Sequence, residues 1–187
     1  MRKDPESEIY GDLLSPLAEC LIVCGSVDQA RRVAEEAQVW RSFLGRMTNT
    51  LQSDRLSGWA HLAQGGTGNR LRAIYFFARG LSRGLVVPDE PQLAMKLGAD
   101  LTRAIWAGRT KSLARFTAVA SEVSVVREAC QTICSHCESW IATDDLPVPD
   151  VFLNDLGMRS AIGIATQFTL YLFASSGLDL KSEIKRL

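Results

Sequence analysis

The sequence predicts an all-α protein, a single-domain bundle of six to eight helices with a buried apolar C-terminal helix. Apolar residues recur at steps of three and four along most of the chain, and strand-like alternation is almost absent. Glycine and proline fall between these periodic segments, where helices begin and end. With 187 residues, 47% of them hydrophobic, the chain can bury one core, so residues 1–187 are expected to form one domain.

Two helices are expected at the N-terminal end. The first spans residues 6–24 and is interrupted at Ser15-Pro16, because serine caps a helix and proline opens a first turn. Ser26 then begins a long helix with a heptad-like apolar stripe. This stripe consists of Ala30, Val33, Ala37, Trp40, Leu44, Met47 and Leu51.

Four further helices are expected in the middle of the chain. They cover residues 54–62, 69–84, 91–107 and 110–142, and a glycine-rich turn over 65–69 separates the first two. In the helix over 69–84 one face is apolar. It carries Ile74, Phe77, Leu81 and Leu85. The last of the four carries a second unbroken stripe, made of Val119, Val123, Val126, Cys130, Ile133, Cys137 and Trp140.

The C-terminal part is expected to contain the central helix of the bundle. After a turn over 144–149 and a short helix over 150–156, an apolar helix covers 158–176, and the two striped helices pack over it. Residues 1–5 and 180–187 are expected to be loose ends.

Neither a membrane location nor secretion is expected. The stretch 160–178 is uncharged and long enough to span a bilayer, but its glycines, hydroxyls and amide dilute its hydrophobicity, so we interpret it as a buried helix. The first eight residues are charged and lack an apolar signal segment. Five cysteines are an odd number, which indicates free thiols in a reducing compartment. The sequence therefore predicts a cytoplasmic (intracellular) protein.

Charge is distributed very unevenly along the chain. The formal net charge is zero, yet residues 70–115 carry nine basic and three acidic side chains, and residues 116–158 carry one basic and seven acidic ones. Most of the basic residues are arginines, which suit phosphates, carboxylates and aromatic faces. This pattern predicts a binding surface for an anionic partner.

The predicted surface lies on one face of the helix over 69–84, where arginines alternate with aromatic residues. Guanidinium groups interleaved with aromatic rings are typical of single-stranded nucleic acid binding. Two cations further along the chain extend the patch. The predicted binding residues are Arg72, Tyr75, Phe76, Arg79, Arg83, Lys111 and Arg115.

Two other roles are open for these arginines. They form a solvated face, or they pair with acidic residues, either of their own chain or of a second copy in a head-to-tail homo-oligomer. The acidic residues considered for this pairing are Glu122, Glu128, Glu138, Asp144, Asp145, Asp150 and Asp155.

A cysteine cluster provides an alternative, enzymatic hypothesis. Cys134 and Cys137 form a C-x-x-C that contains His136, and Glu122 lies twelve residues before the first cysteine. This spacing resembles the active-site motif of alkylhydroperoxidase D, an all-helical family of thiol peroxidases. The resemblance implies a cycle through a disulfide between Cys134 and Cys137, with Glu122 and His136 in proton transfer. The family's second histidine corresponds to Ile141 here.

The same cysteines fit a purely structural role. Cys130 and Cys137 lie in an apolar stripe, and a free cysteine is commonly buried as a small hydrophobic residue. Zinc would require four convergent ligands, so we expect neither a metal nor another cofactor.

A third hypothesis is a helix-groove protein-interaction module. Residues 30–36 and 65–81 resemble helical segments of Bcl-2-like proteins, although the family's Asn-Trp-Gly-Arg motif is absent. Of the three, the sequence favours a non-enzymatic binding and assembly protein. Its expected partner is anionic, either nucleic acid or an acidic protein surface.

Overall fold

A computed structural model describes residues 5–44, 47–87, 91–107, 109–143 and 153–185 of the chain. Over these residues it contains helices and no strands, which confirms the predicted all-α bundle. The elements are α1 (Pro5–Val23), α2 (Val27–Leu44), α3 (Met47–Gln64), α4 (Thr67–Gly84), α5 (Pro91–Trp106), the 3-10 helix η1 (Thr110–Arg115), α6 (Val123–Thr143), α7 (Leu156–Ser175) and α8 (Leu180–Lys185).

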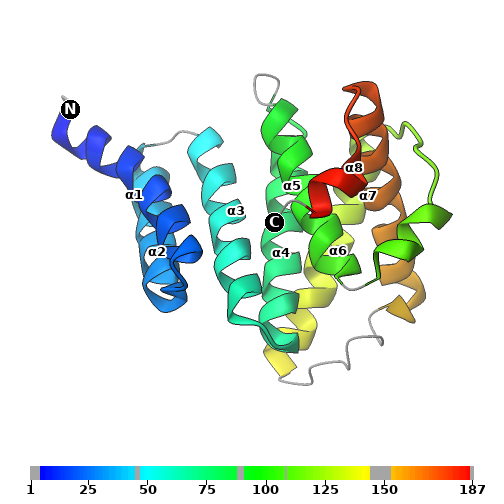
Figure 1. The fold of residues 1–187 in the computed structure, drawn as a ribbon, viewed down its shortest axis with the longest axis horizontal. Coiled ribbons are helices and arrows are strands. Elements are labelled where there is room, and N and C mark those ends of the chain that lie inside the picture. Colours follow the sequence, from blue (N-terminus) through cyan, green and yellow to red (C-terminus); the bar gives the residue numbers. More distant parts are fainter. Residues whose placement is uncertain (1–4, 45–46, 88–90, 108, 144–152, 186–187) are drawn as a thin grey trace.

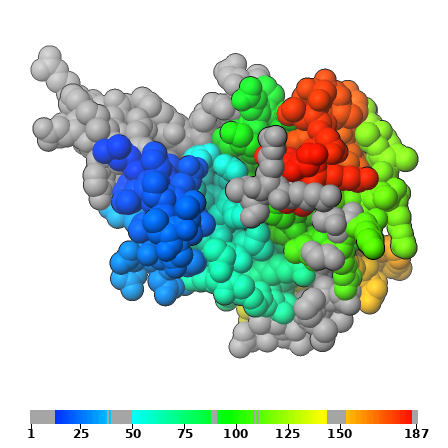
Figure 2. Space-filling model, in the orientation of Figure 1, coloured from blue at the N-terminus to red at the C-terminus, as the bar shows by residue number. Residues whose placement is uncertain are grey.

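The helices follow one another along the long axis of the molecule (Figure 1). The hairpin of α1 and α2 forms one end and packs on α3, while α6 and α7 lie toward the other end. Helix α4 is central, because α3, α5 and α6 all pack against it. Figure 2 shows the α1–α2 end and α8 on the visible surface.

Helix α4 is buried along much of its length, and its small residues let neighbouring helices pack closely against it. Its buried residues are Leu71, Ala73, Ile74, Phe77, Ala78, Gly80, Leu81, Ser82 and Gly84. A Cβ atom on Gly80 would lie 2.8 Å from Leu97 of α5, so this glycine permits the close approach of the two helices. The buried positions include Ile74, Phe77 and Leu81, which confirms the apolar face predicted from their spacing.

The apolar C-terminal helix is present as α7, but it is not the centre of the bundle. One side of α7 is buried against α5 and α6, while Leu156 and Tyr171 are exposed. Of the two striped segments, α6 packs on α7, whereas α2 packs on α1 and α3. Among the described residues, none of the helices combines the length and hydropathy needed to cross a bilayer.

The boundaries of several predicted helices were wrong. The predicted stripe from Ala30 to Leu51 is divided between α2 and α3, and α3 replaces the short helix over 54–62. Helix α1 continues through Pro16 without interruption. Prolines and serines are thus weaker stops here than their local preferences suggest, because tertiary packing stabilises the longer helices.

The predicted helix over 110–142 also begins too early. The chain forms η1, leaves helical structure over 116–122 and starts α6 at Val123, so Val119 is exposed instead of contributing to a stripe. Thr117 and Val119 are β-branched, and such residues favour extended backbone over helix. Within α6 the stripe is buried at Val126, Cys130, Ile133 and Cys137, as predicted, whereas Val123 is exposed and Trp140 is half-buried.

The C-terminal tail is packed, contrary to the expectation of a loose end. Leu180 and Ile184 of α8 are buried, and Arg103 of α5 donates hydrogen bonds to the carbonyl oxygens of Glu183 and Ile184. Residues 153–155, the end of the predicted short helix 150–156, are not α-helical. Residues 1–4, the turn predicted over 144–149, the first part of the predicted short helix (150–152) and the last two residues of the predicted loose end (186–187) lie outside the described residues.

The close contact between α3 and α4 generates a prediction about stability. A Cβ atom on Gly58 would lie 2.7 Å from two ring carbons of the fully buried Phe77. We expect Gly58→Ala to lower the free energy of unfolding by about 1–3 kcal/mol, because this overpacking outweighs the helix preference of alanine. Urea unfolding measures the change.

Gly163→Ala in α7 is the matched control. Its Cβ atom would meet only Phe116, at 3.9 Å, so this variant should be as stable as the original protein or more stable. Equal stability of the two variants would contradict the tight α3–α4 contact.

Candidate functional site

Two arginines of the predicted binding face are used inside the protein. The Asp54 side chain of α3 is fully buried, and its two oxygens accept hydrogen bonds from Arg79 and Arg83 of α4. Arg79 donates from Nε and Nη2 to Oδ1, at 3.1 and 2.5 Å, and Arg83 donates from Nη1 to Oδ2 at 3.0 Å. Of the roles considered for these two arginines, the structure shows pairing within their own chain, and their role in binding a partner stays a prediction.

The aromatic residues of the predicted face are also engaged. The guanidinium carbon of Arg79 lies 5.1 Å from the ring centroid of Tyr75 and 4.9 Å from that of Phe76. Phe76 stacks on His61 of α3, and the Tyr75 hydroxyl accepts a hydrogen bond from Arg79. These rings are half-buried against the protein's own side chains and do not form an open stacking platform.

A second buried carboxylate repeats the arrangement. Asp100 of α5 accepts hydrogen bonds from Arg55 Nε at 2.6 Å and Trp59 Nε1 at 3.1 Å, and Arg103 Nη1 lies 3.4 Å from its other oxygen. Burial raises the pKa of Asp100, although the two arginines oppose the shift. Arg70 donates to the carbonyl oxygens at the end of α5, so it is an internal contact as well.

Sequence reasoning missed Asp54 as the partner of the basic segment. All the acidic residues it considered follow position 121, whereas Asp54 precedes the basic segment. A signal was present, because Asp54 lies three residues after Leu51 and four before Gly58, on the buried face of its helix. An aspartate at such a position indicates a buried ion pair, since an unpaired buried charge is very costly.

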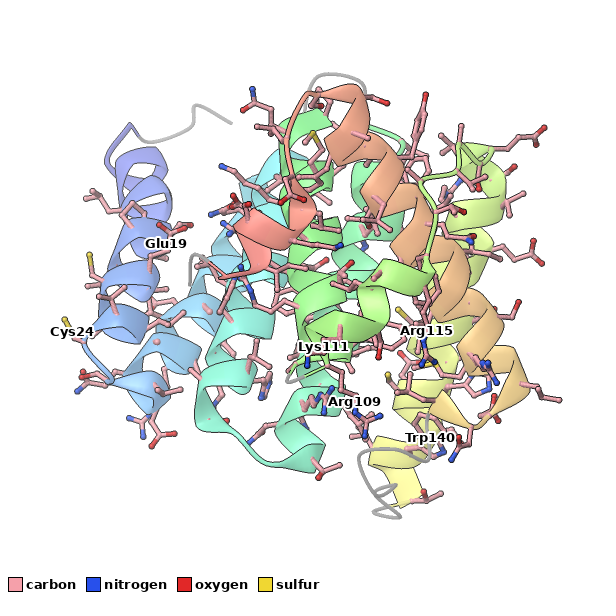
Figure 3. The ribbon with its side chains drawn as sticks, turned by 45° about the vertical axis from the view of Figure 1, so that its right-hand side comes forward. Glu19, Cys24, Arg109, Lys111, Arg115 and Trp140 are labelled. Carbon is pink, nitrogen blue, oxygen red and sulfur yellow. The ribbon has the colours of Figure 1, made fainter. Side chains whose placement is uncertain are left out.

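The other cations of the predicted set are Arg72, on α4 like Arg79 and Arg83, and Lys111 and Arg115 on η1. Arg72, Lys111 and Arg115 are exposed, and no ion pair to any of the three is found within the described part of the chain. In Figure 3 Arg115 lies on the side of the molecule away from Cys24, which follows the end of α1, and Lys111 lies nearer the middle. The predicted set is thus split between two regions and does not form one continuous patch.

Arg115 borders a pocket of about 500 Å³ between η1 and the first turns of α7. The pocket, called here the η1–α7 pocket, is lined by Trp106, Ser112, Arg115, Phe116, Leu153, Asn154, Arg159 and Ile162. Arg159 is exposed and, like Arg115, has no ion pair with any described residue. Trp106 and Phe116 form an aromatic wall, with ring centroids 5.3 Å apart. Sequence reasoning missed Arg159, because it is an isolated cation beside the acidic segment.

Tyr75, Arg79 and Arg83 line a different pocket, of about 440 Å³, between α4 and α6. This α4–α6 pocket is lined by Tyr75, Arg79, Ser82, Arg83, Val86, Arg127, Gln131, Cys134, Ser135 and Glu138. It is the place where the arginine face meets the cysteine-bearing helix. Sequence reasoning did not single out Arg127.

The cysteines of the C-x-x-C lie in the middle of α6 as free thiols. Cys137 is fully buried, and Cys134 is half-buried with its Sγ 3.7 Å from the carbonyl oxygen of Tyr75. Burial raises the pKa of the Cys134 thiol to about 12 and raises that of Cys137 as well. A neutral thiol is a poor nucleophile, so this setting favours packing over redox chemistry.

The proposed proton-transfer residues are not gathered around these thiols. Glu122 is exposed before the start of α6 and accepts a hydrogen bond from Ser124. The Nδ1 atom of His136 lies 2.9 Å from the carbonyl oxygen of Thr132, and its Nε2 lies 3.4 Å from Asp155. Over the described residues, no group of three or more His, Cys, Asp or Glu side chains is placed to hold a metal ion.

The two segments that suggested a helix groove are not neighbours. Residues 30–36 lie in α2 and most of 65–81 lies in α4, and α3 separates the two helices (Figure 1). They therefore do not form the two walls of one groove.

Comparison with known proteins gives no match: no family model, no curated protein and no solved structure is significantly similar to this chain.

The shared carboxylate generates a second prediction. Asp54→Asn leaves Arg79 and Arg83 facing each other without the negative charge, so we expect a loss on the order of 3 kcal/mol in the free energy of unfolding. Arg83→Gln should cost about 1 kcal/mol or less, because Arg79 still neutralises Asp54 and the Arg83 side chain is 42% exposed. A loss below about 0.5 kcal/mol for Asp54→Asn would show that the ion pair contributes nothing.

A third prediction concerns the thiols. Cys20 and Cys24 are exposed and should react with iodoacetamide in the folded protein at neutral pH, whereas the buried Cys130 and Cys137 should react only after unfolding. Cys134 should react slowly, because its pKa is raised to about 12. Mass spectrometry of the labelled peptides distinguishes them. Labelling of Cys134 as fast as that of Cys20 would instead favour the thiol-peroxidase hypothesis.

Proposed function

We propose that this chain is a non-enzymatic helical binding protein that captures an acidic protein segment at the η1–α7 pocket. The proposal rests on which arginines are already paired inside the protein and which are not. Arg79 and Arg83 are occupied by Asp54, whereas Arg115 and Arg159 border one pocket, are exposed and have no ion pair to any residue described.

The pocket offers apolar contact beside the charge. Trp106 is 9% exposed and Phe116 is half-buried, so the aromatic wall is fixed before a partner arrives. Ser112 and Asn154 add polar groups to the lining. A carboxylate flanked by an apolar side chain suits this combination. Arginine pairs with carboxylates in a planar, bidentate manner, and a preformed apolar wall lowers the entropic cost of ordering side chains on binding.

An acidic protein segment fits the geometry better than nucleic acid. Non-specific binding of single strands needs a row of cations along a groove and exposed rings on which bases stack. Tyr75 and Phe76 are covered by Arg79, and the η1–α7 pocket has two cations, Arg115 and Arg159, instead of a row of them along a groove. A second copy of this chain is one candidate partner, since Glu122 and Glu128 are exposed on its surface.

The test is a fluorescence titration with a labelled peptide rich in glutamate and phenylalanine, with a single-stranded oligothymidine as the competing probe. In Arg115→Gln combined with Arg159→Gln, we expect the Kd for the peptide to rise at least about tenfold, or about 1.4 kcal/mol. The affinity of the original protein should fall with added salt, because exposed charges are screened.

Arg32→Gln combined with Arg72→Gln is the matched control, since it removes two exposed cations elsewhere and should leave the Kd unchanged. Equal losses of peptide affinity in both double variants would indicate non-specific charge attraction and contradict specific binding at the η1–α7 pocket. Tighter binding of the oligothymidine would favour nucleic acid as the partner. Sedimentation at low salt tests for the second copy, and a dimer that the Arg115 and Arg159 changes abolish would identify it.

A further inference from the structure

We propose that the α4–α6 pocket is a second, separate binding site, which takes a small organic monocarboxylate with an apolar body. This site shares no lining residue with the η1–α7 pocket, and its ligand is a small molecule.

The pocket is built from matching faces of two antiparallel helices. Its lining residues on the α4 side, which extends to Val86, have the same spacing as those on α6. The Cys134 thiol lies 3.7 Å from the carbonyl oxygen of Tyr75, and Glu138 contributes to the raised pKa of the Tyr75 hydroxyl. Tyr75 and Glu138 therefore mark one end of the pocket, and Arg83 and Arg127 mark the other.

The Arg83 and Arg127 end has unsatisfied positive charge. Arg79 and Arg83 share the single carboxylate of Asp54, so one positive charge remains between them. Arg127 has no ion pair among the described residues, and its Nε atom is buried without a hydrogen-bond partner. A buried donor without an acceptor is costly, and a bound carboxylate would supply the acceptor.

The opposite end limits the charge of the ligand. Glu138 is negative and lies beside the Tyr75 hydroxyl, so a second anionic group on the ligand would be repelled there. Between the two ends the lining includes Val86 and the neutral thiol of Cys134, which contact an apolar body. A volume of about 440 Å³ is within the range of small-molecule sites. These features favour a monocarboxylate over phosphate or a dicarboxylate.

Calorimetric titration with 4-phenylbutyrate tests the proposal, with its neutral amide, glutarate and inorganic phosphate as comparison probes. We expect 4-phenylbutyrate to bind at least about tenfold more tightly than each of the others. Arg127→Gln should weaken its binding at least about tenfold, while Glu138→Gln should strengthen it several-fold. This opposite response of two residues that line the same pocket is not expected from a merely structural role.

Two controls make the outcome specific. Arg127→Gln removes an unsatisfied donor, so its Tm without ligand should be unchanged or higher, which separates loss of binding from loss of folding. Bound 4-phenylbutyrate should also slow labelling of Cys134 but not of Cys20. Equal binding of acid and amide, no binding at millimolar concentration, or an unchanged affinity in Arg127→Gln would overturn the proposal.

The two proposals fail separately. Arg115→Gln combined with Arg159→Gln should leave the affinity for 4-phenylbutyrate unchanged, whereas Arg127→Gln should leave peptide binding at the η1–α7 pocket unchanged. A parallel loss of both activities in either variant would contradict the separation of the two sites.

Discussion

The structure depends on two buried aspartates that each bind two arginines. Asp54 joins α3 to Arg79 and Arg83 of α4, and Asp100 of α5 binds Arg55 of α3 together with Arg103. Removing a carboxylate from water is costly, and only close, well-directed hydrogen bonds compensate for this cost. Helices α3, α4 and α5 are therefore held in a specific register as well as packed.

This constraint determines which cations can bind a partner. Arginines that bind a buried carboxylate are engaged within the protein, as Arg79 and Arg83 are by Asp54 and Arg55 and Arg103 are by Asp100. Among the cations without an ion pair to a described residue, Arg115 and Arg159 lie at the η1–α7 pocket and Arg127 lies in the α4–α6 pocket. Within the basic segment 70–115, some arginines are structural because they pair with a buried carboxylate, and others are left to bind a partner. The sequence alone does not show which arginines belong to each group.

Much of the fold could be predicted from the sequence, because helical spacing of apolar residues reports directly on burial. Ile74, Phe77 and Leu81 on α4 are in the core as their spacing indicates, and so are Cys130 and Cys137 on α6. Helix ends were predicted less well. The non-helical segment over 116–122 interrupts an apolar spacing that would have continued, so periodicity alone did not locate the start of α6.

The candidate sites were much harder to predict. Arg79 and Asp54 are 25 residues apart, and no local pattern indicates that α3 and α4 bring them together. Arg127 and Arg159 are single cations in acidic surroundings, and they become part of a site only through the packing of α6 and α7 against their neighbours. Spacing along one helix identifies a face, whereas charge neutralisation depends on residues from several helices.

Asp54 and Arg79 are energetically coupled across α3 and α4, and the separation of structural from binding arginines depends on this coupling. A double-mutant cycle with Asp54→Ala and Arg79→Ala, followed by urea unfolding, measures this coupling directly. We expect a coupling energy of about 1.5–3 kcal/mol, as for charged hydrogen bonds in a protein interior. A coupling below about 0.5 kcal/mol would mean that Arg79 is free to serve a partner, and it would contradict the division between structural and binding arginines.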